Sequence, residues 1–141
     1  MSARGGGDEV PIAADADVVR VRQLVRARAQ AAGLGLVDLT KVVTAASELA
    51  RNTLVHGGGG TARVEAVAGT TAGGRPRSGV RAVFVDAGPG IPDVRAALQD
   101  GWSSGTGLGL GLSGARRLVD EFDLTSGVGS GTRVVVVKWG R

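Results

Sequence analysis

Two helical patterns follow one another near the start of the chain, with no strand pattern between them. The stretch 15–33 has apolar residues at helical spacing, can be capped by Asp15 or Asp17, and ends at Gly33. The stretch 37–55 carries a longer apolar stripe and is followed by a run of glycines. Two neighbouring helices argue against the strict alternation of strand and helix that a doubly wound parallel sheet requires.

The strand patterns come mostly in pairs. "TARVEAVAG" (61–69) and "VRAVFVD" (80–86) flank a Gly- and Pro-rich turn at 70–79, which predicts an antiparallel hairpin. A second pair, 123–126 and 132–139, also flanks a glycine turn. Helices are predicted at 92–101 and 112–122, and a strand at 9–13 contains Pro11, which favours a sheet edge. This order predicts an α/β (α+β) two-layer sandwich: a mixed, mainly antiparallel sheet with helices on one face.

Composition narrows the class of protein. The 141 residues can form one domain, which we place at 9–141, after a glycine-rich segment 1–8 that we expect to be disordered. There is no cysteine, no apolar run near the ~20 residues of a membrane span, and no secretory signal pattern, so we expect a cytoplasmic protein with no membrane partner. Aromatic residues make up 3% and tyrosine is absent, so we expect no nucleic-acid partner despite a net charge of +4.

The motif "SELARN" lies in the helix at 37–55. Glu48 and Asn52 are four residues apart and share a helix face with His56, one turn further on. A carboxamide oxygen suits Mg²⁺ that also binds substrate phosphates, and a nearby glutamate can accept a proton from an attacking hydroxyl. The alternative is an ordinary solvated face of an amphipathic helix.

The motif "DAGPGI" follows the strand at 80–86. A carboxylate at a strand end, such as Asp86, can accept a hydrogen bond from an exocyclic amine such as adenine N6. Gly88 and Gly90 would let a flat ring lie against the backbone. The alternative is a simple acidic turn.

The motif "GTGLGLG" occupies 105–111. Its backbone N–H groups, which lead into a predicted helix, could cradle phosphates. The alternative is a flexible linker, but leucines alternate with the glycines, which is unusual for a linker. The Rossmann and P-loop fingerprints are both absent from the sequence.

In their order and spacing, "ELARN", "DAGPGI", "GTGLGLG" and the C-terminal "GSGT" resemble the ATP-binding boxes of the GHKL ATPase superfamily, over about residues 10–139. Within that superfamily, "SELARN", "GPGIPDVRAALQDGWSS" and "GLSGARRLVDEF" are most similar to the RsbT-type serine/threonine protein kinases of the anti-sigma switch kinase group. The chain has no room for the transducer domain of gyrase, Hsp90 or MutL, and it lacks the H-box of histidine kinases. The resemblance implies the Bergerat ATP-binding fold.

The resemblance also implies roles for individual residues. Glu48 would be the general base or a water-positioning residue, Asn52 would ligate Mg²⁺, and Asp86 would bind adenine N6. The implied nucleotide-binding residues are Asn52, Asp86, Gly88, Gly90, Ile91, Gly105, Thr106, Gly107, Leu108, Gly109, Gly111 and Thr132. No lysine lies near the glycine-rich lid to bind the γ-phosphate, which leaves Arg51, Arg95 and Arg116 as candidates.

The activity that this family implies is transfer of the ATP γ-phosphate, with Mg²⁺, to Ser or Thr of a STAS-domain antagonist or scaffold protein. The released kinase would then activate a PP2C-type phosphatase. One alternative is a W-type anti-sigma factor kinase that sequesters a sigma factor. The other is a catalytically inactive binding module.

Overall fold

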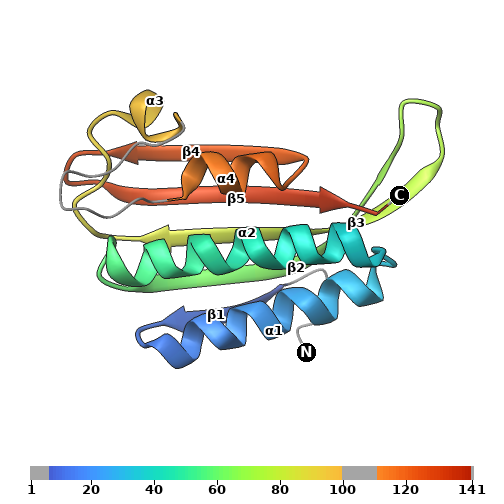
Figure 1. Ribbon diagram of the computed structural model, residues 1–141, viewed down its shortest axis with the longest axis horizontal. Helices are drawn as coiled ribbons and strands as arrows, with labels where there is room; N and C mark the ends of the chain where they lie inside the picture. The colour runs from blue at the N-terminus through green and yellow to red at the C-terminus, as the bar shows by residue number, and fades with distance from the viewer. Residues whose placement is uncertain (1–6, 100–110, 141) are drawn as a thin grey trace.

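A computed structural model describes residues 7–99 and 111–140 of the chain (Figure 1). The described elements follow the predicted order of strands and helices. In chain order they are β1 (Asp8–Ile12), α1 (Asp15–Ala31), α2 (Leu36–Val55), β2 (Gly60–Thr70), β3 (Pro76–Asp86), α3 (Val94–Ala97), α4 (Leu112–Arg117), β4 (Glu121–Gly127) and β5 (Gly131–Trp139).

The strands form one sheet in the order β1-β2-β3-β5-β4, and all four neighbouring pairs are antiparallel. β1 lies at an edge, as Pro11 predicted. β5 inserts between β3 and β4, so the last strand of the chain lies near the middle of the sheet. All of the described strand pairs are antiparallel, whereas we predicted a mixed, mainly antiparallel sheet.

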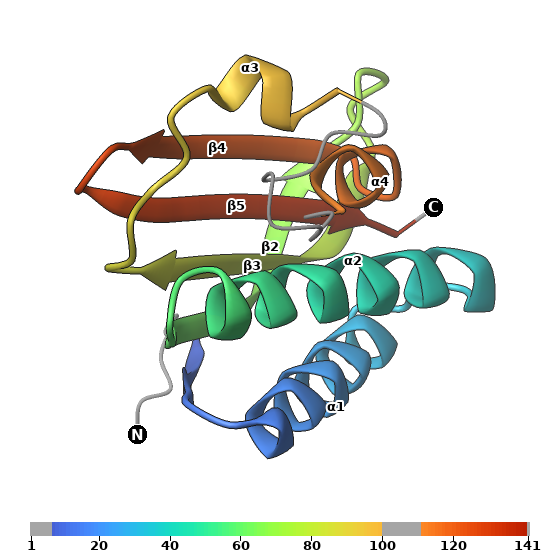
Figure 2. The same ribbon diagram turned by 60° about the vertical axis from the view of Figure 1, so that its left-hand side comes forward.

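Helices α1, α2 and α4 cover one face of the sheet, which confirms the predicted two-layer arrangement (Figures 1 and 2). The core between the layers combines the apolar stripes of α1 and α2 with alternate residues of the central strands. Its largest fully buried side chains include Phe84, Ile12, Leu49, Val42 and Val136. None of the helices in the described part of the chain has the length and hydropathy needed to cross a membrane.

The hairpin β2–β3 is longer than predicted, because its turn covers 71–75 rather than 70–79. Thr70 pairs with Pro76 at the end of the ladder, so both strands continue into the Gly- and Pro-rich segment. The indole of Trp139 explains this extension. A Cβ added at Gly69 or Gly79 would lie 3.1 Å or 2.9 Å from indole carbons, so the ring covers both glycines. An aromatic side chain across strand glycines stabilises a pairing that those glycines would otherwise weaken.

Other predicted boundaries also differ from the structure. The helix predicted at 112–122 ends at Arg117, and β4 begins at Glu121 rather than at 123. Backbone pairing of Glu121 with Val137 replaces the last helical turn. Of the helix predicted at 92–101, residues 94–97 are helical, and residues 100–110 lie outside the described part. Asp8, which we had placed in the disordered segment, begins β1 and forms an ion pair with Arg28.

One buried ion group connects the helical layer to the sheet at the end where Trp139 lies. Lys138 is only 3% exposed, although its side chain is charged. Its Nζ lies 3.5 Å from Asp38 Oδ1 in the first turn of α2 and 3.4 Å from Asp120 Oδ1 just before β4. Because the side chain of Asp120 also accepts from the Trp139 N–H at 2.7 Å, this group helps to fix where β4 starts.

Candidate functional site

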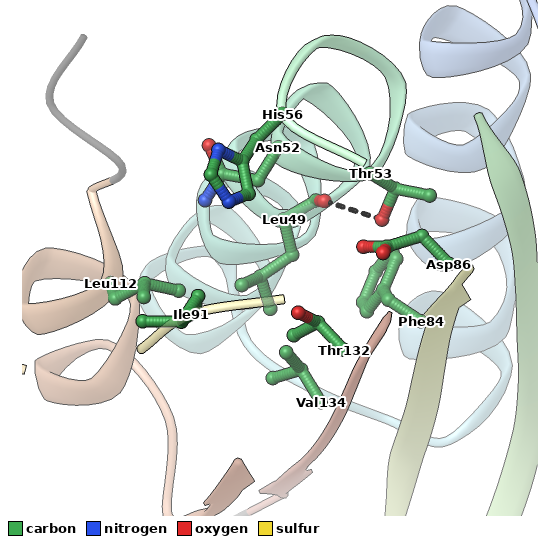
Figure 3. A pocket seen from close by; sticks show the side chains of 10 residues that line it. All are labelled: Leu49, Asn52, Thr53, His56, Phe84, Asp86, Ile91, Leu112, Thr132 and Val134. Atoms are coloured by element: carbon green, nitrogen blue, oxygen red, sulfur yellow. Dashed lines mark hydrogen bonds between the residues drawn. The ribbon is translucent and has the colours of Figure 1, made fainter. Parts of the chain in front are cut away.

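A pocket lies between the C-terminal half of α2 and the ends of β3 and β5 (Figure 3). The space between these elements, counted together with solvent at its open side, is about 330 Å³. Along the paired strands β3 and β5 the pocket lies at the opposite end from Lys138. The residues that line it are Leu49, Asn52, Thr53, His56, Phe84, Asp86, Ile91, Leu112, Thr132 and Val134. Four of them, Asn52, Asp86, Ile91 and Thr132, were predicted as site residues, and the fold brings them together from three separate segments.

The strand register places the polar wall of the pocket. Gly60 pairs with Asp86, Asp86 pairs with Thr132, and Thr132 pairs with Ser126. Directly opposed residues on neighbouring strands point to the same face of a sheet. The carboxylate of Asp86 and the hydroxyl of Thr132 are therefore neighbours on the face that the helices cover, and Figure 3 shows both in the same pocket.

The row of paired residues next to this one forms the floor. Phe84 pairs with Val134, and both are buried. Ile91 and Leu112 add apolar side chains from two other segments. An apolar floor beside a few oxygen atoms is typical of a small-molecule site that holds a flat, partly apolar group.

The carboxylate of Asp86 is held in place by its own loop. Its Oδ1 accepts a hydrogen bond from the Gly88 N–H at 2.9 Å. Gly57 lies against the other side of the same carboxylate, and a Cβ at that position would overlap it. The missing side chain of Gly57 therefore leaves the space that the Asp86 carboxylate occupies.

The last two turns of α2 supply the opposite wall. Asn52 lines the pocket, while Thr53 donates its hydroxyl to the Leu49 carbonyl oxygen at 2.9 Å (Figure 3). Among the described residues, the buried Nε2 of His56 has no hydrogen-bond partner. A buried polar atom without a partner in a pocket marks a position where a ligand can supply the missing bond. We had given His56 no ligand role, although its spacing of four from Asn52 placed it on the same helix face.

Glu48 is exposed and does not line the pocket. Its carboxylate instead lies beside Gly111, where an added Cβ would be 2.6 Å from Glu48 Oε1. Gly111 has a φ of 65° and precedes the first residue of α4. Glu48 and Asn52 lie one helical turn apart in α2. Asn52 faces the pocket, whereas Glu48 lies beside Gly111, just before α4.

Gly88 and Gly90 do not line the pocket, and the structure gives their small size a different reason. A Cβ at Gly88 would be 2.7 Å from the Gly57 carbonyl oxygen. A Cβ at Gly90, whose φ is +78°, would overlap the Gly127 carbonyl oxygen at the end of β4. Both glycines thus allow close backbone contacts within the protein.

The other predicted residues do not line the pocket in the described part of the chain. Gly105, Thr106, Gly107, Leu108 and Gly109 lie outside the described residues. Arg51, Arg95 and Arg116, the candidates for a γ-phosphate contact, are all exposed, and none lines the pocket.

Comparison with known proteins places the chain in a family. Residues 12–138 match a family described as "Histidine kinase-like ATPase domain". The serine/threonine-protein kinase RsbT of Bacillus subtilis (strain 168) is 44% identical over 130 residues, which cover 92% of this chain and 94% of that protein. A solved histidine kinase domain, from the blue-light activated histidine kinase of Erythrobacter litoralis EL346, is 20% identical with a TM-score of 0.47, and the match covers 98% of this chain and 69% of that one. The chain thus belongs to the histidine kinase-like ATPase domain family.

Proposed function

We propose that this chain is an ATP-dependent protein serine/threonine kinase that acts in a cytoplasmic partner-switching pathway. The observation that carries the proposal is the meeting of Asn52, Asp86 and Thr132 in one pocket with an apolar floor. The similarity to the serine/threonine-protein kinase RsbT of Bacillus subtilis supports the same activity.

The adenine ring fits this pocket in chemical terms. Asp86 and Thr132 offer oxygen atoms to the polar edge of the ring, and Phe84, Ile91 and Val134 offer apolar surface to the rest of it. The carboxylate, held by the Gly88 N–H, accepts a hydrogen bond from the N6 amine. His56 Nε2 is a further polar atom available to the bound nucleotide.

Asn52 is the residue that we assign to Mg²⁺. Its carboxamide is at the pocket wall, on the helix turn between Glu48 and His56. Among the described residues no group of three or more His, Cys, Asp or Glu could hold a metal ion. Mg²⁺ commonly takes one or two protein oxygens and completes its shell with waters and substrate phosphates, which suits a single asparagine. When bound there, the ion neutralises charge on the phosphates.

Glu48 is the candidate proton acceptor. In the transfer, the substrate hydroxyl oxygen bonds to the γ-phosphorus, the bond from that phosphorus to the bridging oxygen breaks, and ADP leaves. The hydroxyl proton passes to the Glu48 carboxylate. An exposed position beside Gly111 suits this role, because the acceptor is a side chain of another protein that must approach from solvent.

The partners in this proposal come from the resemblance to RsbT-type kinases. The phosphate acceptor is a STAS-domain antagonist or scaffold protein, and the released kinase activates a PP2C-type phosphatase. The two alternative functions differ from this one in their binding partner or in phosphate transfer. A W-type kinase would hold a sigma factor, and an inactive module would hold its partner without phosphorylating it.

The deciding experiment incubates the purified protein with radiolabelled ATP, Mg²⁺ and candidate STAS-domain proteins. We expect label on Ser or Thr of one of them, and its loss in Glu48→Gln. Asp123→Asn, which removes an exposed carboxylate from β4 outside the pocket, is the matched control and should transfer normally. Nucleotide binding without transfer to any STAS-domain protein would contradict the kinase proposal, and co-purification with a sigma factor would favour the W-type role.

A further inference from the structure

Ser126 lies in β4 next to Thr132 and does not line the candidate pocket. Its side-chain oxygen contacts three polar groups. The Ile91 N–H donates to it at 2.8 Å, the Gly131 carbonyl oxygen lies 3.0 Å away, and Thr132 Oγ1 lies 2.8 Å away. Two of these neighbours, Ile91 and Thr132, do line the pocket. Ser126 also lines the adjoining hollow beside Asp86 and Thr132, and toward a ligand in the candidate pocket we expect it to act through its neighbours.

The number of hydrogens decides how these contacts are arranged. A serine hydroxyl has one hydrogen to donate and can accept twice, whereas a carbonyl oxygen only accepts. The contact with Gly131 is a hydrogen bond only when Ser126 donates to it. Thr132 must then donate its own hydrogen to Ser126 Oγ. With the Ile91 N–H as the second donor, this is the arrangement in which all three contacts are hydrogen bonds.

We propose that Ser126 is a positioning residue, which holds the hydroxyl hydrogen of Thr132 away from the pocket and leaves Thr132 as an acceptor toward a bound purine. This inference rests on the proposed function. Asp86 is paired with Thr132 across β3 and β5, and an ionised carboxylate also only accepts. The two strands thus present acceptors alone, which selects an amino group over a carbonyl oxygen at C6 of the purine.

The selection comes from what a carbonyl oxygen would meet. An oxygen at C6 would face two acceptors, and a buried polar group without a partner is costly. A threonine hydroxyl that is free to rotate could relieve this by donating to the oxygen, and Ser126 removes that freedom. Because Ser126 also binds the Ile91 N–H, its loss will change stability as well. The test must therefore compare two nucleotides in the same variant.

Inosine triphosphate is the suitable second nucleotide, since it carries a carbonyl oxygen in place of the 6-amino group of ATP. Its N1 also carries a hydrogen that ATP lacks, but this difference is the same in every variant, so the change of preference between variants reports on Ser126. Calorimetry in Mg²⁺ gives dissociation constants for both nucleotides. The preference is the ratio of the dissociation constant for inosine triphosphate to that for ATP, and we expect it to be above one in the wild type. Ser126→Ala should reduce this ratio by about tenfold, the effect of one hydrogen bond. Ser126→Thr keeps a hydroxyl and should keep the ratio. Thr125→Ala removes an exposed hydroxyl from the other face of β4 and should leave the ratio unchanged.

A double variant tests the route through Thr132. In a Thr132→Val background, Ser126→Ala should not change the ratio further, because the hydroxyl that Ser126 orients is gone. A further change would overturn this route. If Ser126→Ala does not fold, Ser126→Cys replaces it, because a thiol is a weak donor and a weak acceptor and should also reduce the ratio.

The outcomes separate the inference from the proposed function. An ATP preference that stays the same in folded Ser126→Ala or Ser126→Cys overturns the role of Ser126 alone. A wild-type protein that binds neither nucleotide refutes the proposed function.

Discussion

Gly90→Ala distinguishes two explanations for why a residue without a side chain is needed at position 90. The sequence motif suggests that Gly90 is small so that a nucleotide ring can approach the backbone. The structure shows instead that a Cβ would overlap the Gly127 carbonyl oxygen. In the first case the variant loses only the stability that its positive φ costs, and it loses nucleotide binding. In the second case it is destabilised further, with no nucleotide present.

The expected loss has two parts. Gly90 has a φ of +78°, and a residue with a Cβ in that region costs about 1–2 kcal/mol. The overlap with Gly127 adds about 1–3 kcal/mol, typical of inserting a methyl group into a packed site. The turn cannot move away freely, because Ser130 N–H donates to the Gly127 carbonyl oxygen and Gly129 N–H donates to the Pro89 carbonyl oxygen, both at 2.9 Å.

Gly33→Ala is the matched control. Gly33 has a φ of +83°, and nothing lies within 4 Å of an added Cβ. It therefore shares the backbone cost, and also the effect of the extra methyl group on the unfolded chain, but has no overlap. Urea unfolding without nucleotide should show Gly90→Ala to be less stable than Gly33→Ala by about 1–3 kcal/mol. Equal stability of the two variants, within about 0.5 kcal/mol, would refute the packing explanation.

Three further predictions follow from the site and the core. Asn52→Ala should weaken Mg-ATP binding, whereas Glu48→Gln should bind nearly as well as wild type while single-turnover transfer falls by roughly 10²–10⁴-fold; the opposite pattern would show that the two roles are exchanged. Asp86→Asn should lower ATP affinity by roughly 10- to 100-fold in calorimetry, through loss of a charge-assisted hydrogen bond, and unchanged affinity would remove Asp86 from the adenine site. Lys138→Met leaves two acidic side chains without their buried cation and should lower the free energy of unfolding by about 2–4 kcal/mol, with ATP affinity unchanged; wild-type stability in urea would show that the ion group contributes nothing.

The helices and strands could be predicted where local pattern and tertiary packing agree. The apolar periodicity and the flanking glycines placed α1 and α2 to within two residues of their observed ends. The start of β3 was missed because Gly79 discourages a strand locally, and the ring that covers it belongs to Trp139, far away in sequence. The end of α4 was missed for a similar reason. Residues 118–122 fit a helix by periodicity, but pairing with β5 and the bonds of Asp120 favour an extended chain.

The motifs identified Asn52, Asp86, Ile91 and Thr132, which the fold brings together, while their ligand stays a prediction. Sequence reasoning did not assign the apolar side chains of Leu49, Phe84 and Val134 to the pocket, since they read as ordinary core positions. They become part of a site only because the helix and the two strands leave a space there.

Ser126 was missed for a more basic reason. Nothing in its neighbourhood in sequence marks it, because its partners come from another strand and another loop. The pairing of β4 with β5 aligns Ser126 with Thr132, and a shift of one residue would turn its hydroxyl to the other face. The glycines show the same dependence on register and contact. The sequence does not distinguish a glycine that makes room for a ligand from one that makes room for the protein itself. At Gly57 the space is filled by a carboxylate, and at Gly88 and Gly90 by backbone of this same chain. A motif can therefore identify the residues that meet a ligand more readily than those that hold such residues in place.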